Sequence, residues 1–141
     1  MIFPVQSTSE NAENSTVARN YAFILAGCLV FPLMIVAHFI ARGNRGDPRE
    51  FKHSHYRFQY RTTSLALLGF LICMLIATGM VVGLPSETHL QHVHQRMRLV
   101  LLSNFVWLIM LWLAIRSIRG LYLSAAHRPI PNPAMLWVWP R

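Results

Sequence analysis

Three stretches of the chain contain no Lys, Arg, Asp or Glu, and each is long enough to cross a lipid bilayer as a helix. They are Tyr21–Ala41, Thr63–Leu84 and Leu99–Ile115. A hydrocarbon layer ~30 Å thick needs about 20 apolar residues in helical form. None of the stretches alternates as a membrane β-strand does, and only helices and closed barrels satisfy their backbone in lipid. The pattern predicts an all-α integral membrane protein with three transmembrane helices.

A further helix is predicted between the first two stretches. Asp47 can cap it, Pro48 suits the first helical position, and Glu50 follows three residues after the cap. Nothing breaks this helix before the end of the second stretch, so it would be about 55 Å long. That is nearly twice the thickness of the hydrocarbon layer. We therefore expect residues 48–61 to form a basic interfacial helix before the second span, with a bend near Arg61.

The same pattern divides the chain into three parts. Residues 1–20 are a polar tail, rich in Ser, Thr and Asn and without a helical pattern. Residues 21–126 are expected to form a single transmembrane domain. Residues 127–141 form a tail in which three prolines enforce an extended chain, while Trp137 and Trp139 are expected to rest in the membrane interface or on a partner.

Charge adds an orientation to this picture. The net charge is +8, and ten of the thirteen Lys and Arg residues fall in 42–62 and 116–141. The other flanking segments, 1–20 and 85–98, carry equal numbers of acids and bases. Basic residues near span ends stay on the cytoplasmic side, which predicts an N-terminus outside and a C-terminus in the cytoplasm. A basic face of this kind is attracted to anionic phospholipid. No secretory signal peptide is apparent.

Three residues within the spans have a predicted role in helix packing. Gly79 and Gly83 form a small-x₃-small pattern that permits close approach of another helix. Asn104 lies in the middle of the third stretch and needs a hydrogen-bond partner across helices. Pro32 is expected to kink the first span and to free a carbonyl near Cys28.

The histidines and cysteines indicate no resident cofactor. His38 lies one turn inside the first span, and no histidine occupies the same level of another span, which argues against a haem between helices. His89, His92 and His94 are weak candidates for a metal site, because zinc sites usually recruit four ligands and no cysteine is near. We expect the segment that contains these histidines to be a solvated loop. The two cysteines have no metal-type spacing.

Catalytic residues are also not apparent. The predicted spans hold no acid, and no nucleophile stands beside a base. Binding of nucleic acid lacks a supporting motif or aromatic platform. The sequence therefore favours a protein without enzymatic activity.

Two motifs resemble a known family. Ser54–Thr62 reads SHYRFQYRT at the start of the second span, and Arg116–Leu121 reads RSIRGL at the end of the third. This combination resembles an uncharacterised family of small bacterial inner-membrane proteins, which is distantly similar to the fold of the chloroplast inner-envelope translocon subunit. Members of the family commonly carry an aromatic residue where this chain has Thr63. The resemblance covers about residues 50–133 and implies a multi-pass protein of the bacterial inner membrane, with no catalytic residues to carry over.

The matching residues are expected to share one level, where the second and third spans meet at the cytoplasmic interface. They are Ser54, His55, Arg57, Gln59, Arg61, Arg116, Arg119 and Gly120. We expect lipid headgroup or partner contacts from this level and from the C-terminal tail. The expected contact residues are Arg57, Arg61, Arg116, Arg119, His55, Gln59, Trp137 and Trp139.

Taken together, these patterns predict an accessory or scaffold subunit that packs against a larger membrane complex or forms a homo-oligomer. Three short spans enclose little volume, and the ends of the chain resemble docking segments. Two alternatives stay open at this point. One is a component of transport or translocation, built as an oligomer around Gly79 and Gly83. The other is a redox subunit associated with quinone or haem, using His38 or the histidines of 89–94.

Overall fold

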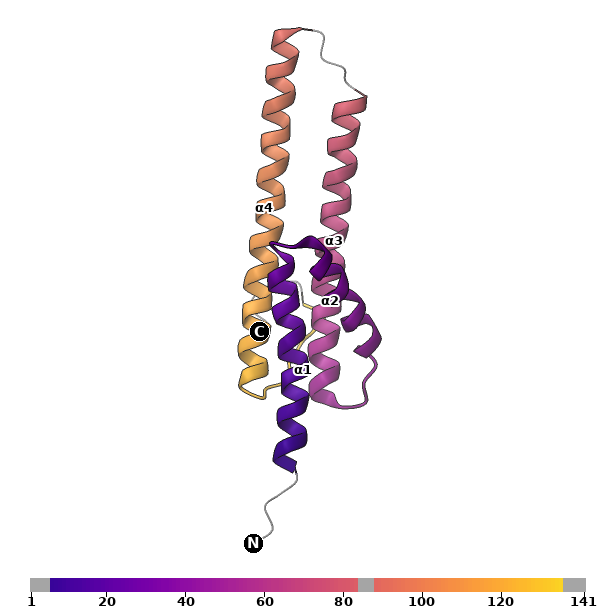
Figure 1. Ribbon diagram of the computed structural model, residues 1–141, viewed down its shortest axis with the longest axis vertical. Coiled ribbons are helices and arrows are strands. Elements are labelled where there is room, and N and C mark those ends of the chain that lie inside the picture. The colour runs from indigo at the N-terminus through magenta and orange to yellow at the C-terminus, as the bar shows by residue number, and fades with distance from the viewer. Residues whose placement is uncertain (1–5, 84–87, 136–141) are drawn as a thin grey trace.

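The computed structural model describes residues 6–83 and 88–135, and in this part of the chain all regular structure is helical. The helices are α1 (Gln6–Gly27), α2 (Phe31–Asn44), α3 (Glu50–Val82) and α4 (His89–Ala125). Figure 1 shows α3 and α4 as a long antiparallel pair. The shorter helices α1 and α2 form a hairpin that packs against one end of this pair. The all-helical prediction is confirmed for the described residues.

Among the described residues, two helices, not three, are long and apolar enough to cross a membrane. They are α3, which contains residues 63–82 of the second apolar stretch, and α4, which contains the third, and most of each apolar window is exposed. A core helix of a water-soluble protein would be mostly buried. Helix α4 extends beyond its apolar stretch on both sides.

The prediction of a first span over Tyr21–Ala41 is wrong. Helix α1 ends at Gly27, and the chain reverses before α2 begins at Phe31. Gly27 permits the reversal because a Cβ atom there would lie 2.7 Å from the Cβ of Met34. Pro32 stands in the first turn of α2, where its missing N–H costs nothing. The proline therefore starts a new helix, rather than kinking one that continues.

The N-terminal segment also differs from the expectation. Residues 6–20 were expected to be part of an unstructured tail, but they form most of α1. The polar residues of this segment pair with polar residues of α3 and α4, as described below, and this pairing is not visible in the local pattern.

The helix expected over 48–61 is observed, and it is continuous with the helix of the second apolar stretch. Residues 50–61 form about the first third of α3, which continues to Val82 as one helix with no break near Arg61. The helix begins at Glu50 rather than Pro48. Asp47 accepts a hydrogen bond from the backbone N–H of Arg49 (3.0 Å) and forms an ion pair with the Arg49 side chain.

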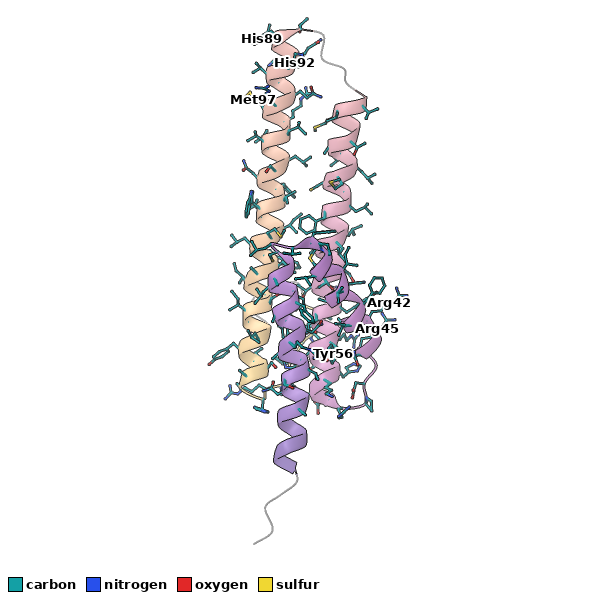
Figure 2. The ribbon with its side chains drawn as sticks, in the orientation of Figure 1. Arg42, Arg45, Tyr56, His89, His92 and Met97 are labelled. Carbon is teal, nitrogen blue, oxygen red and sulfur yellow. The ribbon has the colours of Figure 1, made fainter. Side chains whose placement is uncertain are left out.

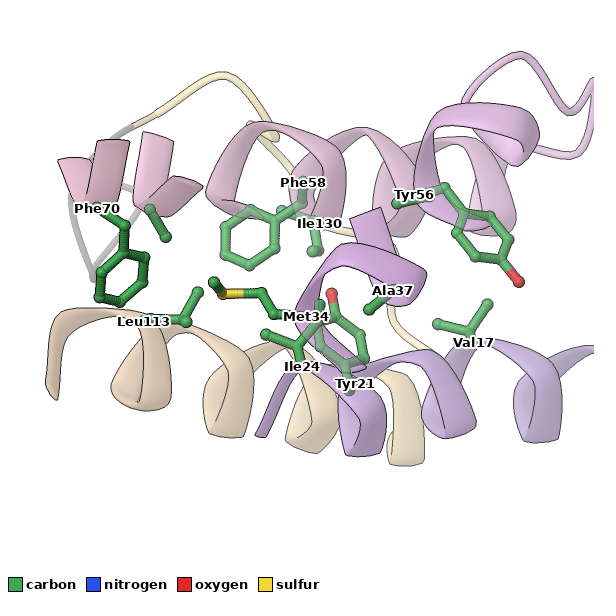
Figure 3. Packing of buried hydrophobic residues seen from close by; sticks show 12 residues of the cluster. Val17, Tyr21, Ile24, Met34, Ala37, Tyr56, Phe58, Phe70, Leu113 and Ile130 are labelled. Atoms are coloured by element: carbon green, nitrogen blue, oxygen red, sulfur yellow. The ribbon is translucent and has the colours of Figure 1, made fainter. Parts of the chain in front are cut away.

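The hydrophobic core lies where all four helices meet. Figure 3 shows that Met34 and Ile24 of the α1–α2 hairpin lie between α3 and α4. The segment after α4 also contributes, because Ile130 is buried against the same cluster. The main buried members of the core are Val17, Tyr21, Ile24, Met34, Ala37, Tyr56, Phe58, Phe70, Leu113 and Ile130. Beyond this junction α3 and α4 continue as a pair with exposed apolar faces (Figure 1).

Candidate functional site

Polar side chains fill part of the interior at the four-helix junction, next to the hydrophobic core. Asn20 of α1 donates through Nδ2 to Oε1 of Gln59 (2.7 Å) and to the carbonyl of Ala37 (3.2 Å). Gln59 in turn donates to the carbonyl of Val17 (3.2 Å). Both amide side chains are almost completely buried. Because an unbonded amide in an apolar interior is costly, this reciprocal pairing fixes α1 and α2 to α3.

His55 connects α1 to the segment that follows α4. Its Nε2 lies 3.1 Å from the carbonyl of Arg128, and its Nδ1 lies 3.1 Å from the hydroxyl of Tyr21. A carbonyl only accepts, so Nε2 carries the proton and Nδ1 accepts from Tyr21. The neighbouring Ser54 accepts a hydrogen bond from the backbone N–H of Ile130 (3.2 Å). Residues 128–130 are therefore held in place by one turn of α3.

Arg116 of α4 is completely buried in the same junction. Its guanidinium carbon lies 4.2 Å from the ring centre of Phe58 and 5.0 Å from that of Trp112. Nε donates to the hydroxyl of Thr62 (3.2 Å), and Nη1 donates to the carbonyl of Met135 (2.9 Å). Two aromatic rings, a hydroxyl and a backbone carbonyl thus contact this arginine. It joins α3, α4 and the C-terminal segment at one point.

Gly120 makes room for close contact between α4 and α1. A Cβ atom at this position would overlap the ring of Tyr21, which is itself buried and bonded to His55. Ser124, one turn further along α4, donates to Oδ1 of Asn14 (2.6 Å). Small residues on this face of α4 therefore let α1 pack directly against its backbone.

A second feature is a basic groove on the outer surface of α3, with a volume of about 650 Å³. It is lined by Arg45, Gly46, His53, Arg57, Tyr60, Arg61, Ser64 and Leu65. The lining residues of α3 recur every three or four positions and so share one helix face. The guanidinium of Arg45 lies over the ring of Tyr60, 4.9 Å from its centre. Figure 2 shows Arg42 and Arg45 at the edge of the bundle, on the side of α2.

The electrostatics of this groove are one-sided. The sequence contains no acid between Glu50 and Glu87, and no acid lines the groove. The nearest carboxylate before α3 is that of Asp47, which forms an ion pair with Arg49. The side-chain hydrogen bond from Arg49 holds the pKa of Asp47 below its usual value. Asp47 therefore stays ionised and bound to Arg49.

A third feature is an exposed stripe along the outer face of α4. Its positions recur at alternating intervals of three and four residues, which is the spacing of a coiled-coil seam. The α4 stripe consists of Leu90, His94, Met97, Leu101, Asn104, Leu108, Leu111, Ile115, Ile118 and Tyr122, all exposed. Asn104 is the central member, and its side chain forms no hydrogen bond with the described part of the chain.

The residues predicted from sequence fall into different environments. His55, Gln59 and Arg116 are buried, whereas Arg57 and Arg61 are exposed in the basic groove. Arg119 is half-buried on α4 beside the α4 stripe. Trp137 and Trp139 lie outside the described residues.

The predicted packing glycines differ from each other. A Cβ atom at Gly79 would meet nothing within 4 Å, so Gly79 makes no close helix contact here. At Gly83 the nearest atom is the carbonyl oxygen of Gly79. Gly120 and Gly27 make the close approaches instead, and Gly120 forms a small-x₃-small pattern with Ser124. Asn20, Tyr21 and Ser124 were also not anticipated as interior polar residues.

The histidines that were weighed as weak cofactor candidates lie in two different places. His38 of α2 shares a hydrogen bond with the hydroxyl of Thr63 (2.9 Å) and stacks on Tyr60. His89 and His92 lie at the far end of α4 in Figure 2. Within residues 6–83 and 88–135, no three His, Cys, Asp or Glu side chains gather closely enough to hold a metal ion.

Comparisons with known proteins give no match for this chain among protein families, curated proteins or solved structures. The resemblance carried by Ser54–Thr62 and Arg116–Leu121 therefore rests on these motifs alone.

Proposed function

We propose that this chain is a two-span membrane protein that acts, without enzymatic activity, as an accessory or scaffold subunit of a larger membrane complex. Helices α3 and α4 form the spans in this proposal. Three features support it: the length and exposure of these helices, the position of the polar junction at one end of them, and the α4 stripe.

Two polar contacts between α3 and α4 support the membrane placement. Arg116 bonds to Thr62 at one level, and Gln95 donates to the carbonyl of Met80 (3.1 Å) at the other. The separation of these levels is about 27 Å along α3 and about 31 Å along α4, at 1.5 Å per residue. This matches a hydrocarbon layer ~30 Å thick. The polar contacts would then lie at the two surfaces of the layer.

The α1–α2 hairpin would enter this layer only partway. His38 contacts Thr63 near the boundary level, whereas Phe31 at the tip packs edge-to-face on Phe70 (5.5 Å). Phe70 lies about 12 Å further along α3 than Thr62. The tip residue Leu29 is 90% exposed, which suits a lipid environment. Because the hairpin returns to the side it came from, α1 would begin on the side where α4 ends.

This placement predicts the labelling of single cysteines by an impermeant thiol reagent in intact cells. In a background without Cys28 and Cys73, Ala12→Cys and Ala126→Cys should react identically, and Leu90→Cys should show the opposite result. The three positions are exposed. If Ala12→Cys behaves like Leu90→Cys, the first apolar stretch crosses the bilayer and the hairpin placement is wrong.

The observation that carries the assembly role is Asn104. In the proposed placement it lies near the middle of the hydrocarbon layer, with its amide exposed and surrounded by the apolar α4 stripe. An amide that faces lipid without a partner is unfavourable, and interhelical hydrogen bonds from Asn drive association in membranes. A heptad stripe with one central polar residue also defines register. The α4 stripe is therefore suited to a partner transmembrane helix.

Charge indicates which kind of helix would fit. Arg98 flanks the α4 stripe toward one end and Arg119 toward the other. In a parallel pair of identical helices these arginines would come to the same depth and repel. A helix of another protein avoids this if it carries a polar residue at mid-depth and acids near the membrane surfaces. We therefore propose such a helix as the occupant.

Replacing Asn104 tests this role. Asn104→Leu should lower the yield of the complex on native gels in mild detergent by about fivefold to thirtyfold, because one interhelical hydrogen bond is worth roughly 1–2 kcal/mol. Ser103→Ala is the matched control, since Ser103 faces the apolar pocket between α3 and α4. A Leu108→Cys variant of the chain should then form a cross-link to a different membrane protein. Cross-links between copies alone, or equal yields for Asn104→Leu and the control, would contradict the proposal.

A further inference from the structure

We propose that the basic groove on α3 binds the phosphate of an anionic phospholipid, with the acyl chains lying along the apolar continuation of the same helix face. The inference rests on the membrane placement proposed above but not on the assembly role of α4. It assigns a specific ligand class to one groove, beyond a general attraction of the basic face to lipid.

The groove offers the right donors for a phosphate. Arg45, Arg57 and Arg61 line it together with His53. A guanidinium binds two phosphate oxygens at once through parallel N–H donors. Arg45 is oriented by its contact with the ring of Tyr60. Three arginines around one concave surface without a lining acid create a positive potential that an anion would neutralise.

The position of the groove along α3 supports a lipid rather than a soluble phosphate compound. Arg61 precedes Thr62, the residue that marks the proposed membrane boundary through its bond to Arg116. Tyr60 lies at the same level, where aromatic residues favour the headgroup region. The arginines would therefore meet phosphates at the depth at which phospholipids carry them.

The apolar end of the groove provides the second half of the match. Leu65 closes the groove on the side of the apolar stretch, and Leu68 and Ile72 continue the same face of α3. All three side chains are exposed, Leu68 to 52%. Polar and apolar parts thus follow each other along one helix face, in the order in which a phospholipid presents its headgroup and its chains. A soluble phosphate ligand would have no use for this track.

The test uses the full chain in nanodiscs that contain either phosphatidylglycerol or phosphatidylcholine, with bound lipid measured after extraction into mild detergent. Arg57→Gln with Arg61→Gln should reduce retained phosphatidylglycerol on the order of thirtyfold. Arg96→Gln with Arg98→Gln removes the same charge at the other end of the helix pair and should leave retention unchanged. Arg57→Lys with Arg61→Lys should give an intermediate loss, because lysine keeps the charge but not the paired donors. All four arginines are exposed, so folding should be preserved.

Several outcomes would overturn the inference. If both pairs of Arg→Gln substitutions lower the retained phosphatidylglycerol equally, the effect is one of nonspecific charge. Retention of phosphatidylcholine equal to that of phosphatidylglycerol would remove the anionic preference. If inorganic phosphate or glycerol phosphate displaces the lipid and binds with the same dependence on Arg57 and Arg61, the groove serves a soluble phosphate compound. Asn104→Leu should leave lipid retention unchanged, which separates failure of this inference from failure of the assembly role.

Discussion

Replacing Gly120 by Val is expected to release the α1–α2 hairpin from the helix pair. The new side chain would overlap the ring of Tyr21. That ring cannot move aside without loss of its hydrogen bond to His55, because it is 1% exposed and enclosed by the core. Overpacking of this kind costs about 1–3 kcal/mol, and the lost hydrogen bond adds about 1 kcal/mol. Titration with SDS in mixed micelles should show a free energy of unfolding lower by about 3 kcal/mol.

Gly79→Val is the matched control for this experiment. Gly79 is also a glycine inside a long helix, but a Cβ atom there would meet nothing within 4 Å. Its replacement should change the free energy of unfolding by less than about 1 kcal/mol. Limited proteolysis near Ala12 should accelerate in Gly120→Val and not in Gly79→Val. Equal behaviour of the two variants would show that α1 does not pack on α4 as described.

Replacing Arg116 by Ala should have an effect of similar or greater size. The substitution removes a buried side chain that packs between Phe58 and Trp112, and it leaves the carbonyl of Met135 without this donor. A cavity of this kind costs about 2–5 kcal/mol, so the variant should unfold at a markedly lower SDS fraction. The C-terminal segment should also become accessible to protease.

Arg116→Met separates the two contributions. Methionine restores much of the volume, and replacing a buried charge by an apolar group is often close to neutral. We therefore expect Arg116→Met to recover more than half of the loss seen in Arg116→Ala. The free energy of unfolding of Arg57→Ala, a substitution at an exposed position, should lie within about 0.5 kcal/mol of that of the unchanged protein. If Arg57→Ala is as destabilised as Arg116→Ala, burial does not explain the role of Arg116.

The sequence predicted the helices whose boundaries depend on local signals. The stretches 63–84 and 99–115 contain no charged residue, and residues 63–82 and 99–115 lie within α3 and α4. Helix α4 also carries a capping box at Thr88 and Gln91 and ends before the prolines that follow Ala125. These signals act over a few residues, so they can be read without knowledge of the fold.

The candidate site was predictable only in part. His55, Gln59 and Arg116 could be named from the family resemblance, but their partners in α1 could not. Asn20 lies 39 positions before Gln59, and nothing in its neighbourhood indicates that it is buried. A polar residue in the interior is defined by the partner that satisfies it, and that partner comes from another element.

By itself the sequence indicated helical structure, apolar segments at 63–84 and 99–115 able to cross a membrane together with a third at 21–41, and basic charge beside them. Only the tertiary structure decided the path of residues 21–41. Their composition suits one long span as well as two short helices, because hydrophobicity does not specify whether the chain continues across the layer or turns back. The contacts of Gly27 with Met34, Phe31 with Phe70 and Asn20 with Gln59 favour the hairpin, and each joins residues that the local pattern treats as independent.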